Sequence, residues 1–207
     1  MDVKNAFLNG DFTEKVYMQA PLGYSDCPDN VCLLRCALYG LKQASRAWFA
    51  KFSDIVHQFG FSSSPHDTTL FICCFDKGMI LLLLYVDDMI ITRDDHFSIS
   101  DFKQFLHQHF EINDFGQLSY FLGLEVSSDS TGYYLSQANY ASDLLSRAGL
   151  TDTKVVSIPF KMNARLTPLN DTPLSDATLF RRLVGSLVYL TITHLNIAHA
   201  VHLVNQF

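Results

Sequence analysis

The chain has 207 residues, of which 48% are hydrophobic and 17% are charged, and its net charge at pH 7 is −6. This length and composition suit one sizeable domain, or a domain with a small appendage. The acidic balance argues against a generic nucleic-acid-binding protein, although a local basic stripe could still bind nucleic acid.

The cysteine pattern and the start of the chain predict the compartment. The five cysteines form no CxxC pair and no metal-finger spacing. Asp2 and Lys4 stand where a secretory signal would have its apolar run. We therefore expect an intracellular protein, in the cytoplasm or nucleus, with reduced thiols, no signal peptide and no transmembrane segment.

The first 60 residues predict two strands and a helix. Asn9-Gly10-Asp11 is a turn signal, and Lys15–Gln19 and Val31–Leu38 are typical of strands. Between residues 38 and 60, apolar residues recur at three- and four-residue steps, the period of an amphipathic helix that Gly60 would end. These residues are Trp48, Phe49, Phe52, Ile55, Val56 and Phe59.

The next stretch predicts two successive hairpins. Thr69–Phe75 and Met79–Val86 flank a Gly-containing loop. Asp87 and Asp88 then interrupt the apolar stretch Met79–Thr92, which reads MILLLLYVDDMIIT. About 20 apolar residues are needed to span a bilayer, so the acidic pair excludes a membrane helix here. The simplest interpretation is a β-hairpin that carries two carboxylates at its tip.

Two adjacent carboxylates in an apolar setting need an explanation. They could be ordinary residues of an exposed turn. If they are partly buried, their like charges are costly unless a positive group lies beside them. Mg²⁺ prefers carboxylate oxygens as ligands, so a divalent metal site is the functional alternative.

The rest of the chain predicts another hairpin and then helices. A helix is expected over Ser98–Phe110, and Tyr120–Ser127 and Tyr133–Gln137 are expected to pair as strands. Ser136 could cap a helix that ends at Gly149, and residues 151–173 are typical of a linker. Further helices are expected from Ser175 or Asp176 to Leu190 and from an Asn196 cap to Phe207. The predicted fold class is α+β, with helices dominating after residue 136.

Six blocks of the chain, in order, resemble the reverse transcriptase of copia-type (Ty1/copia) retrotransposons. They are Asp2-Val3 with Phe7, LYGLKQASRAWF, YVDD, YFLGLEV, LSQANYASDLL and FRRLVGSLVYLT. The resemblance implies a right-hand polymerase palm, an antiparallel sheet with helices on one face, followed by thumb-like helices. It places the palm with partial fingers at residues 1–135 and a thumb-like helical region with a connecting loop at residues 136–207.

The resemblance also implies an RNA-directed DNA polymerase that uses two Mg²⁺ ions, or Mn²⁺ in their place. Asp2 and Asp87 would be direct metal ligands, Asp88 would support the acidic cluster, and the backbone carbonyl of Val3 would complete the metal site. Two ions about 3.5–4 Å apart activate the attacking hydroxyl and stabilise the leaving group in phosphoryl transfer. Carboxylates from different strands must therefore converge.

Other positions that match the family are expected to bind substrate. Phe7 would stack under the incoming sugar and exclude a ribose 2′-hydroxyl, although it could equally be a core aromatic. The other expected nucleotide-binding residues are Tyr39, Gly40 and Tyr85. The expected nucleic-acid-binding residues are Lys42, Gln43, Arg46, Phe121, Leu122 and Gly123. If residue 42 already lies on the helix, Lys42 and Arg46 would share one helix face, which could simply be solvated.

The chain departs from the family pattern in several places. Ser45 replaces a proline, and His194-Leu195-Asn196 replaces an Arg-Pro-Asp segment. Met1 directly precedes Asp2, so we expect a polyprotein fragment without the N-terminal fingers segment and without the ribonuclease H domain.

The expected partners are an RNA or DNA template with its primer, deoxynucleoside triphosphates, and the rest of the polyprotein, including integrase and ribonuclease H, but no membrane. Two alternatives remain open: a non-catalytic remnant that folds and binds nucleic acid or a partner, and a nucleotide cyclase built on a similar palm.

Overall fold

The computed structural model describes the chain except for residues 22, 24–30, 76–77, 94–96, 151–175 and 207. The chain divides into two compact units, Met1–Gly116 and Gln117–Phe207. Helices and antiparallel sheets occur together, which confirms the predicted α+β class. The division groups the hairpin after residue 120 with the helices, whereas the sequence analysis assigns this hairpin to the first domain. The functional boundary at residue 135 stays a prediction.

The first unit is built on a six-stranded sheet in which every paired strand is antiparallel to its neighbour. The strand order is β4 (Ser62–Ser63), β5 (Leu70–Phe75), β6 (Gly78–Tyr85), β7 (Asp88–Arg93), β1 (Asp2–Val3) and β8 (Ile112–Asn113). Both hairpins predicted between residues 69 and 92 form, as β5–β6 and β6–β7. Strand β1 comes from the start of the chain and pairs with both β7 and β8. It therefore links β8 to the rest of the sheet, whose other strands all lie beyond residue 60 in the sequence.

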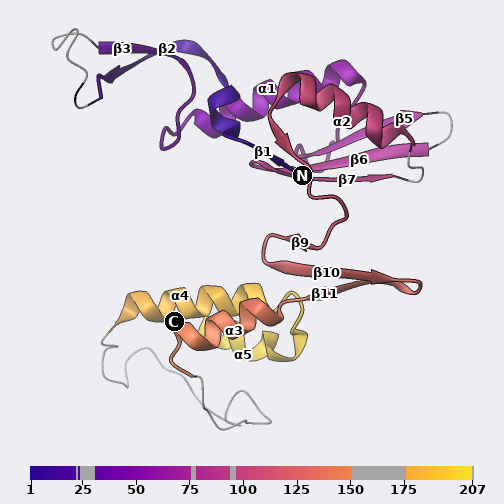
Figure 1. The fold of residues 1–207 in the computed structure, drawn as a ribbon. Coiled ribbons are helices and arrows are strands. Elements are labelled where there is room, and N and C mark those ends of the chain that lie inside the picture. The colour runs from indigo at the N-terminus through magenta and orange to yellow at the C-terminus, as the bar shows by residue number, and fades with distance from the viewer. Residues whose placement is uncertain (22, 24–30, 76–77, 94–96, 151–175, 207) are drawn as a thin grey trace. The chain divides into compact units, whose positions relative to one another are not determined.

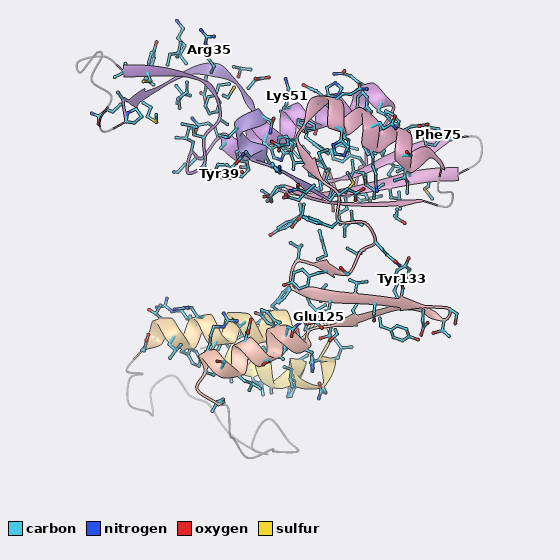
Figure 2. The ribbon with its side chains drawn as sticks, in the orientation of Figure 1. Arg35, Tyr39, Lys51, Phe75, Glu125 and Tyr133 are labelled. Carbon is cyan, nitrogen blue, oxygen red and sulfur yellow. The ribbon has the colours of Figure 1, made fainter. Side chains whose placement is uncertain are left out.

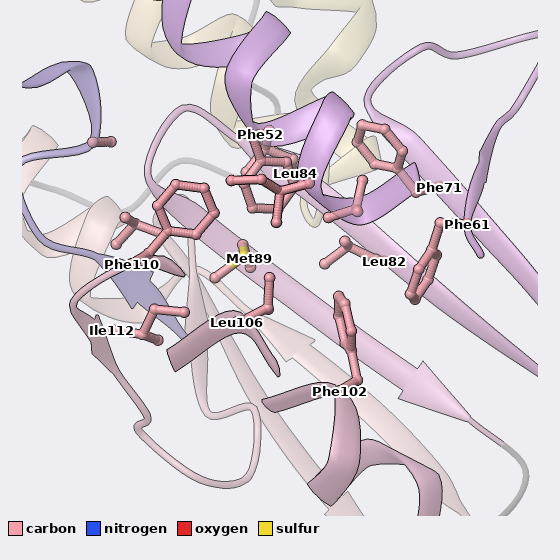
Figure 3. Close-up of a cluster of buried hydrophobic side chains, with 14 of the residues drawn as sticks. Phe52, Phe61, Phe71, Leu82, Leu84, Met89, Phe102, Leu106, Phe110 and Ile112 are labelled. Atoms are coloured by element: carbon pink, nitrogen blue, oxygen red, sulfur yellow. The ribbon is translucent and has the colours of Figure 1, made fainter. Parts of the chain in front are cut away.

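Two helices cover one face of this sheet, α1 (Ala44–Phe59) and α2 (Phe97–His109) (Figure 1). Alternate residues of β6 point toward them, because side chains on a strand alternate between its two faces. Ile80, Leu82 and Leu84 are accordingly buried, together with Phe52 of α1 and Phe102 of α2 (Figure 3). Helix α1 ends as predicted at Gly60, whose φ of 109° is the left-handed conformation that glycine adopts freely.

The first unit also contains a two-stranded ribbon, which extends away from the six-stranded sheet (Figure 1). It consists of β2 (Asp11–Gln19) and β3 (Val31–Cys36), and a 3₁₀ helix, η1 (Ala6–Asn9), connects it to β1. The predicted strands are therefore present, although β2 begins directly after Gly10. Lys51 Nζ of α1 lies 2.7 Å from Asp11 Oδ2, and this ion pair joins the base of the ribbon to the helix (Figure 2).

The second unit combines a small sheet with helices. Its elements are β9 (Tyr120–Phe121), β10 (Leu124–Asp129), β11 (Gly132–Ser136), α3 (Ala138–Arg147), α4 (Ala177–Leu190), η2 (Leu195–Ile197) and α5 (Ala198–Val204). The prediction of one strand over Tyr120–Ser127 is wrong, because a tight turn breaks it. Leu122 and Gly123 form this turn with positive φ angles of 49° and 87°, and Phe121 pairs with Leu124 across it.

The helix caps of the second unit were predicted with mixed success. Asp176 accepts hydrogen bonds from the backbone N–H groups of Thr178 and Leu179 at 2.9 and 2.8 Å, which confirms this N-cap. The predicted Asn196 cap is wrong: residue 196 lies inside η2, and α5 begins at Ala198. The predicted linker at residues 151–173 lies outside the described residues.

Polar contacts connect the hairpin of the second unit to its helices. Gln137, only 1% exposed, donates to the Tyr189 carbonyl and accepts a hydrogen bond of 2.8 Å from the Thr193 hydroxyl. The Tyr189 hydroxyl donates to the Leu122 carbonyl. Glu125 Oε1 accepts from the Asn139 N–H at 3.0 Å, so a carboxylate of β10 lies at the first turn of α3 (Figure 2).

No helix among the described residues combines the length and the apolar character that crossing a bilayer requires.

We predict that Gly10→Ala destabilises the first unit. A Cβ at residue 10 would lie 2.6 Å from the Trp48 backbone nitrogen and 2.8 Å from the Ala47 carbonyl carbon, so α1 would have to move. Overpacking of this kind costs about 1–3 kcal/mol in the free energy of unfolding, measurable by urea denaturation.

Gly185→Ala is the matched control for this substitution. Nothing lies within 4 Å of a Cβ at residue 185 inside α4, so alanine should stabilise that helix by about 1 kcal/mol. Equal effects of the two substitutions would contradict the close approach of Gly10 to α1.

Candidate active site

A row of four side chains crosses the sheet of the first unit. Strand pairing places Tyr85 opposite Asp88, Asp88 opposite Asp2, and Asp2 opposite Asn113. The residue next to each of them in its strand is buried: Leu84, Met89, Val3 and Ile112. Since side chains alternate along a strand, the row lies on the sheet face opposite to α1 and α2. Two carboxylates that are 86 positions apart in the sequence therefore become direct cross-strand neighbours.

The third carboxylate belongs to the turn between β6 and β7. Val86 and Asp87 are the two residues of this turn, because Tyr85 and Asp88 close it as a pair. Val86 has a φ of 58°, a left-handed conformation that is rare for a β-branched residue. The carbonyls of both turn residues are held: Trp48 Nε1 donates to Val86 O at 2.6 Å, and the Val3 N–H donates to Asp87 O at 2.9 Å.

The three carboxylates form no ion pair with a side chain among the described residues. None of the ion pairs there involves Asp2, Asp87 or Asp88. Asp2 Oδ2 accepts a hydrogen bond of 3.2 Å from Asn113 Nδ2. Burial raises the pKa of the Asp88 carboxyl, and the negative charges of Asp87 and Asp2 raise it further, whereas the Met1 amino group lowers it. The site is therefore electronegative and has unused oxygen ligands.

The three carboxylates do not converge on one point where they could all bind the same metal ion. In the described part of the chain, no three His, Cys, Asp or Glu side chains are arranged so that they could hold one ion. Their carboxylate oxygens and their mutual repulsion nevertheless fit a hard divalent cation, which takes oxygen ligands. The assignment of Asp2, Asp87, Asp88 and the Val3 carbonyl as metal ligands stays a prediction.

Two of the predicted nucleotide-binding residues contact each other. The rings of Phe7 and Tyr39 lie with their centroids 4.7 Å apart. Phe7 also packs against the hydrophobic core, so the alternative of a core aromatic is partly correct, while Tyr39 is 53% exposed. Gly40 follows with a φ of 88°, and Tyr85 lies in the row beside Asp88.

The predicted nucleic-acid-binding residues fall into two groups. Lys42 and Gln43 precede α1 and Arg46 lies in its first turn, so the expectation that Lys42 and Arg46 share one helix face is wrong. The Lys42 and Arg46 side chains are exposed. Phe121, Leu122 and Gly123 belong to the second unit, where they form the end of β9 and the tight turn after it.

Two residues of this site were not predicted as site residues from the sequence. Asn113 binds Asp2 because the two-residue strand β8 pairs with β1, and so short a strand leaves no sequence pattern. Trp48 was predicted only as part of the apolar face of a helix. Its N–H group is the signal that could have identified it, because a buried indole usually hydrogen-bonds to a partner.

Known proteins resemble this chain in sequence. A family model described as "Reverse transcriptase (RNA-dependent DNA polymerase)" matches residues 1–162. A retrovirus-related Pol polyprotein from transposon RE1 of Arabidopsis thaliana is 42% identical over the whole chain, and one from transposon TNT 1-94 of Nicotiana tabacum is 34% identical. The chain spans 14% and 16% of their lengths.

A putative transposon Ty5-1 protein of Saccharomyces cerevisiae is 28% identical over the whole chain, which covers 68% of its length. No solved structure matches the chain significantly. These relatives confirm the resemblance to copia-type polyproteins that the six sequence blocks suggested.

The raised pKa of Asp88 predicts how Asp88→Asn changes stability with pH. A carboxyl with a raised pKa in the folded state binds its proton more tightly there, so stability falls as the pH rises from the ordinary Asp range through the raised pKa. Asp88→Asn removes this charge and should raise the free energy of unfolding at pH 7. The gain should shrink as the pH falls and the wild-type carboxyl becomes protonated. Denaturation midpoints between pH 4 and 7 measure this, and a gain independent of pH would contradict the electrostatic explanation.

Proposed function

Because the chain belongs to the reverse transcriptase family of RNA-dependent DNA polymerases, we propose that its first unit is the polymerase palm of a copia-type retrotransposon polyprotein. The observation that carries the proposal is the row in which Asp88 and Asp2 face each other beside the turn that holds Asp87. Family membership implies a nucleic-acid template, deoxynucleotides as substrates and a place within a longer polyprotein. RNA as the template, Mg²⁺ as the ion, and integrase and ribonuclease H as neighbouring domains are parts of the proposal.

The carboxylates would bind the ions that this chemistry needs. Asp2 and Asp87 would be direct ligands with the Val3 carbonyl, and Asp88 would add negative charge beside them. When bound, divalent ions lower the pKa of the attacking 3′-hydroxyl and neutralise charge on the triphosphate. The protein holds its ligands on two neighbouring strands and the turn beside them: hydrogen bonds from the Val3 backbone to Asp87 and between Met1 and Met89 restrict their movement. Asn113 keeps one Asp2 oxygen oriented.

The aromatic pair beside the site would select the sugar. Phe7 is held between the core and the Tyr39 ring, so it offers a fixed surface to an incoming deoxyribose. A ring in this place would collide with a ribose 2′-hydroxyl. Gly40 would allow the backbone to approach the substrate closely, and exposed Lys42 and Arg46 would contact phosphates. In the second unit, the Leu122–Gly123 turn, held by Tyr189, would contact the primer strand.

A second candidate function is a non-catalytic retrotransposon remnant that folds and binds nucleic acid or a protein partner. It is favoured by the finding that Asp2, Asp87 and Asp88 are not gathered into a three-ligand group. The net charge of −6 also argues against general attraction to nucleic acid. The two candidates differ in what Mg²⁺ does to the chain.

We predict that Mg²⁺ raises the melting temperature of the chain near neutral pH. An ion that binds only the folded state stabilises it by mass action, and only folding brings Asp2 to the hairpin. The rise should shrink on acidification, because protons compete for the same oxygens. It should largely vanish in Asp87→Asn but persist in Glu14→Gln, which removes one charge from the exposed β2 strand. Indifference of the wild-type chain to millimolar Mg²⁺ would favour the remnant.

The polymerase proposal also predicts Mg²⁺-dependent extension of a DNA primer on an RNA template. Asp87→Asn should reduce this extension below detection, whereas Glu14→Gln should leave it unchanged. Extension products on a sequencing gel measure both variants. Extension that survives in Asp87→Asn would contradict the assignment of the site, and binding of the template without extension would identify a remnant.

A further inference from the structure

The Trp48 side chain joins helix α1 to the turn that carries Asp87. Trp48 is 1% exposed, and its indole N–H donates to the Val86 carbonyl at 2.6 Å. Its sequence separation from Val86 is 38 residues, so this contact depends entirely on the tertiary fold. The Val86 side chain itself is 44% exposed.

The turn needs an external partner at this point. Val86 adopts a φ of 58°, and a β-branched residue in the left-handed region persists only where the surroundings impose it. Asp87 follows directly, and its own carbonyl accepts the Val3 N–H at 2.9 Å. The Asp87 residue is thus flanked by two carbonyls, one held by α1 and the other held by β1.

Trp48 is itself held firmly, so it can act as an anchor. Its ring packs edge-on against Phe110 with centroids 5.1 Å apart, and Phe52 lies 5.4 Å away. Gly10 passes so close to the backbone nitrogen of Trp48 that a Cβ there would be 2.6 Å from it. The Trp48 ring is therefore packed against its own helix and against Phe110, and the Trp48 backbone is held beside Gly10.

We propose that Trp48 is a positioning residue that holds the Val86–Asp87 turn in its left-handed form and thereby directs the Asp87 carboxylate toward Asp2 and Asp88. The expected effects on divalent-ion binding and catalysis rest on the proposed function. The structural part of the inference, control of the turn by one hydrogen bond, stands independently of that function.

The simpler explanation is that the bond merely satisfies a buried indole donor. Under that explanation, Val86 would keep its conformation without the bond, and only the stability of the core would suffer. Under the proposal, loss of the N–H changes the Val86 backbone and the affinity for Mg²⁺, even when the packing is preserved.

Trp48 is the sole tryptophan of the chain, so a tryptophan analogue supplied during expression replaces this residue alone. β-(3-Benzothienyl)alanine has nearly the shape of tryptophan but carries sulfur in place of the N–H. In the metal-free protein, we expect the backbone ¹³C shifts of Val86 to move away from their left-handed values. The Mg²⁺ dissociation constant should rise about tenfold, the equivalent of one hydrogen bond. In primer extension, kcat should fall while KM for the nucleotide stays nearly constant.

Two controls separate the hydrogen bond from the packing. 5-Fluorotryptophan keeps the N–H and should retain the wild-type Val86 shifts and Mg²⁺ affinity. Phe52→Leu loosens the core beside Trp48 but leaves the donor in place. It should lower the melting temperature without shifting the Val86 resonances or weakening Mg²⁺ binding.

The outcomes distinguish this inference from the proposed function. Unchanged Val86 shifts in the benzothienyl protein would overturn the role of Trp48, whatever the chain does with Mg²⁺. Equal displacement of these shifts in Phe52→Leu would also overturn it, because general packing would then control the turn. If the wild-type chain binds no Mg²⁺ while the Val86 shifts respond as expected, the proposed function fails and the control of the turn by Trp48 stands.

Discussion

The candidate site depends on the insertion of a two-residue strand, β1, between β7 and β8. This pairing sets two carboxylates, Asp2 and Asp88, directly opposite each other, which is unfavourable for like charges. Backbone hydrogen bonds between Met1 and Met89, and from Val3 to Asp87, oppose that repulsion. Val3 is 1% exposed, and burying a valine side chain contributes about 1.5–3 kcal/mol. The fold therefore keeps two carboxylates close together despite their repulsion, which a bound cation would reduce.

Because side chains alternate along its strands, the sheet of the first unit has two different faces. One face packs against α1 and α2 and contains the aromatic and aliphatic core (Figure 3). The other face carries the row from Tyr85 to Asn113. A shift of the register by one residue in β7 would bury Asp88 and expose Met89, so the register is strongly specified by the core. The positions of the carboxylates thus follow from hydrophobic packing on the opposite side of the sheet.

Local patterns predicted the long elements of this chain well. The spacing of Trp48, Phe52 and Val56 identified α1, and the apolar runs around Asp87 identified the β6–β7 hairpin, because each signal extends over many residues. Short features escaped prediction. The turn at Leu122 and Gly123 interrupts an apolar run in which only the glycine suggests a break, and Tyr189 of α4 stabilises it from 67 residues away. Asn196 resembles a cap, yet the chain forms a 3₁₀ turn there and begins α5 later.

The α+β class and the family could be predicted from sequence alone, because they depend on periodicity and on ordered local motifs, and the same motifs singled out the three carboxylates as candidate metal ligands. Which groups come into contact depends instead on the tertiary fold. The neighbours of Asp2 are Asp88 and Asn113, and the partner of the Val86 carbonyl is Trp48. These contacts join residues that are 38 to 111 positions apart. They arise when a short strand and a helix pack against one sheet, and the free energy of that packing is shared over the whole core, so no local stretch of sequence encodes it.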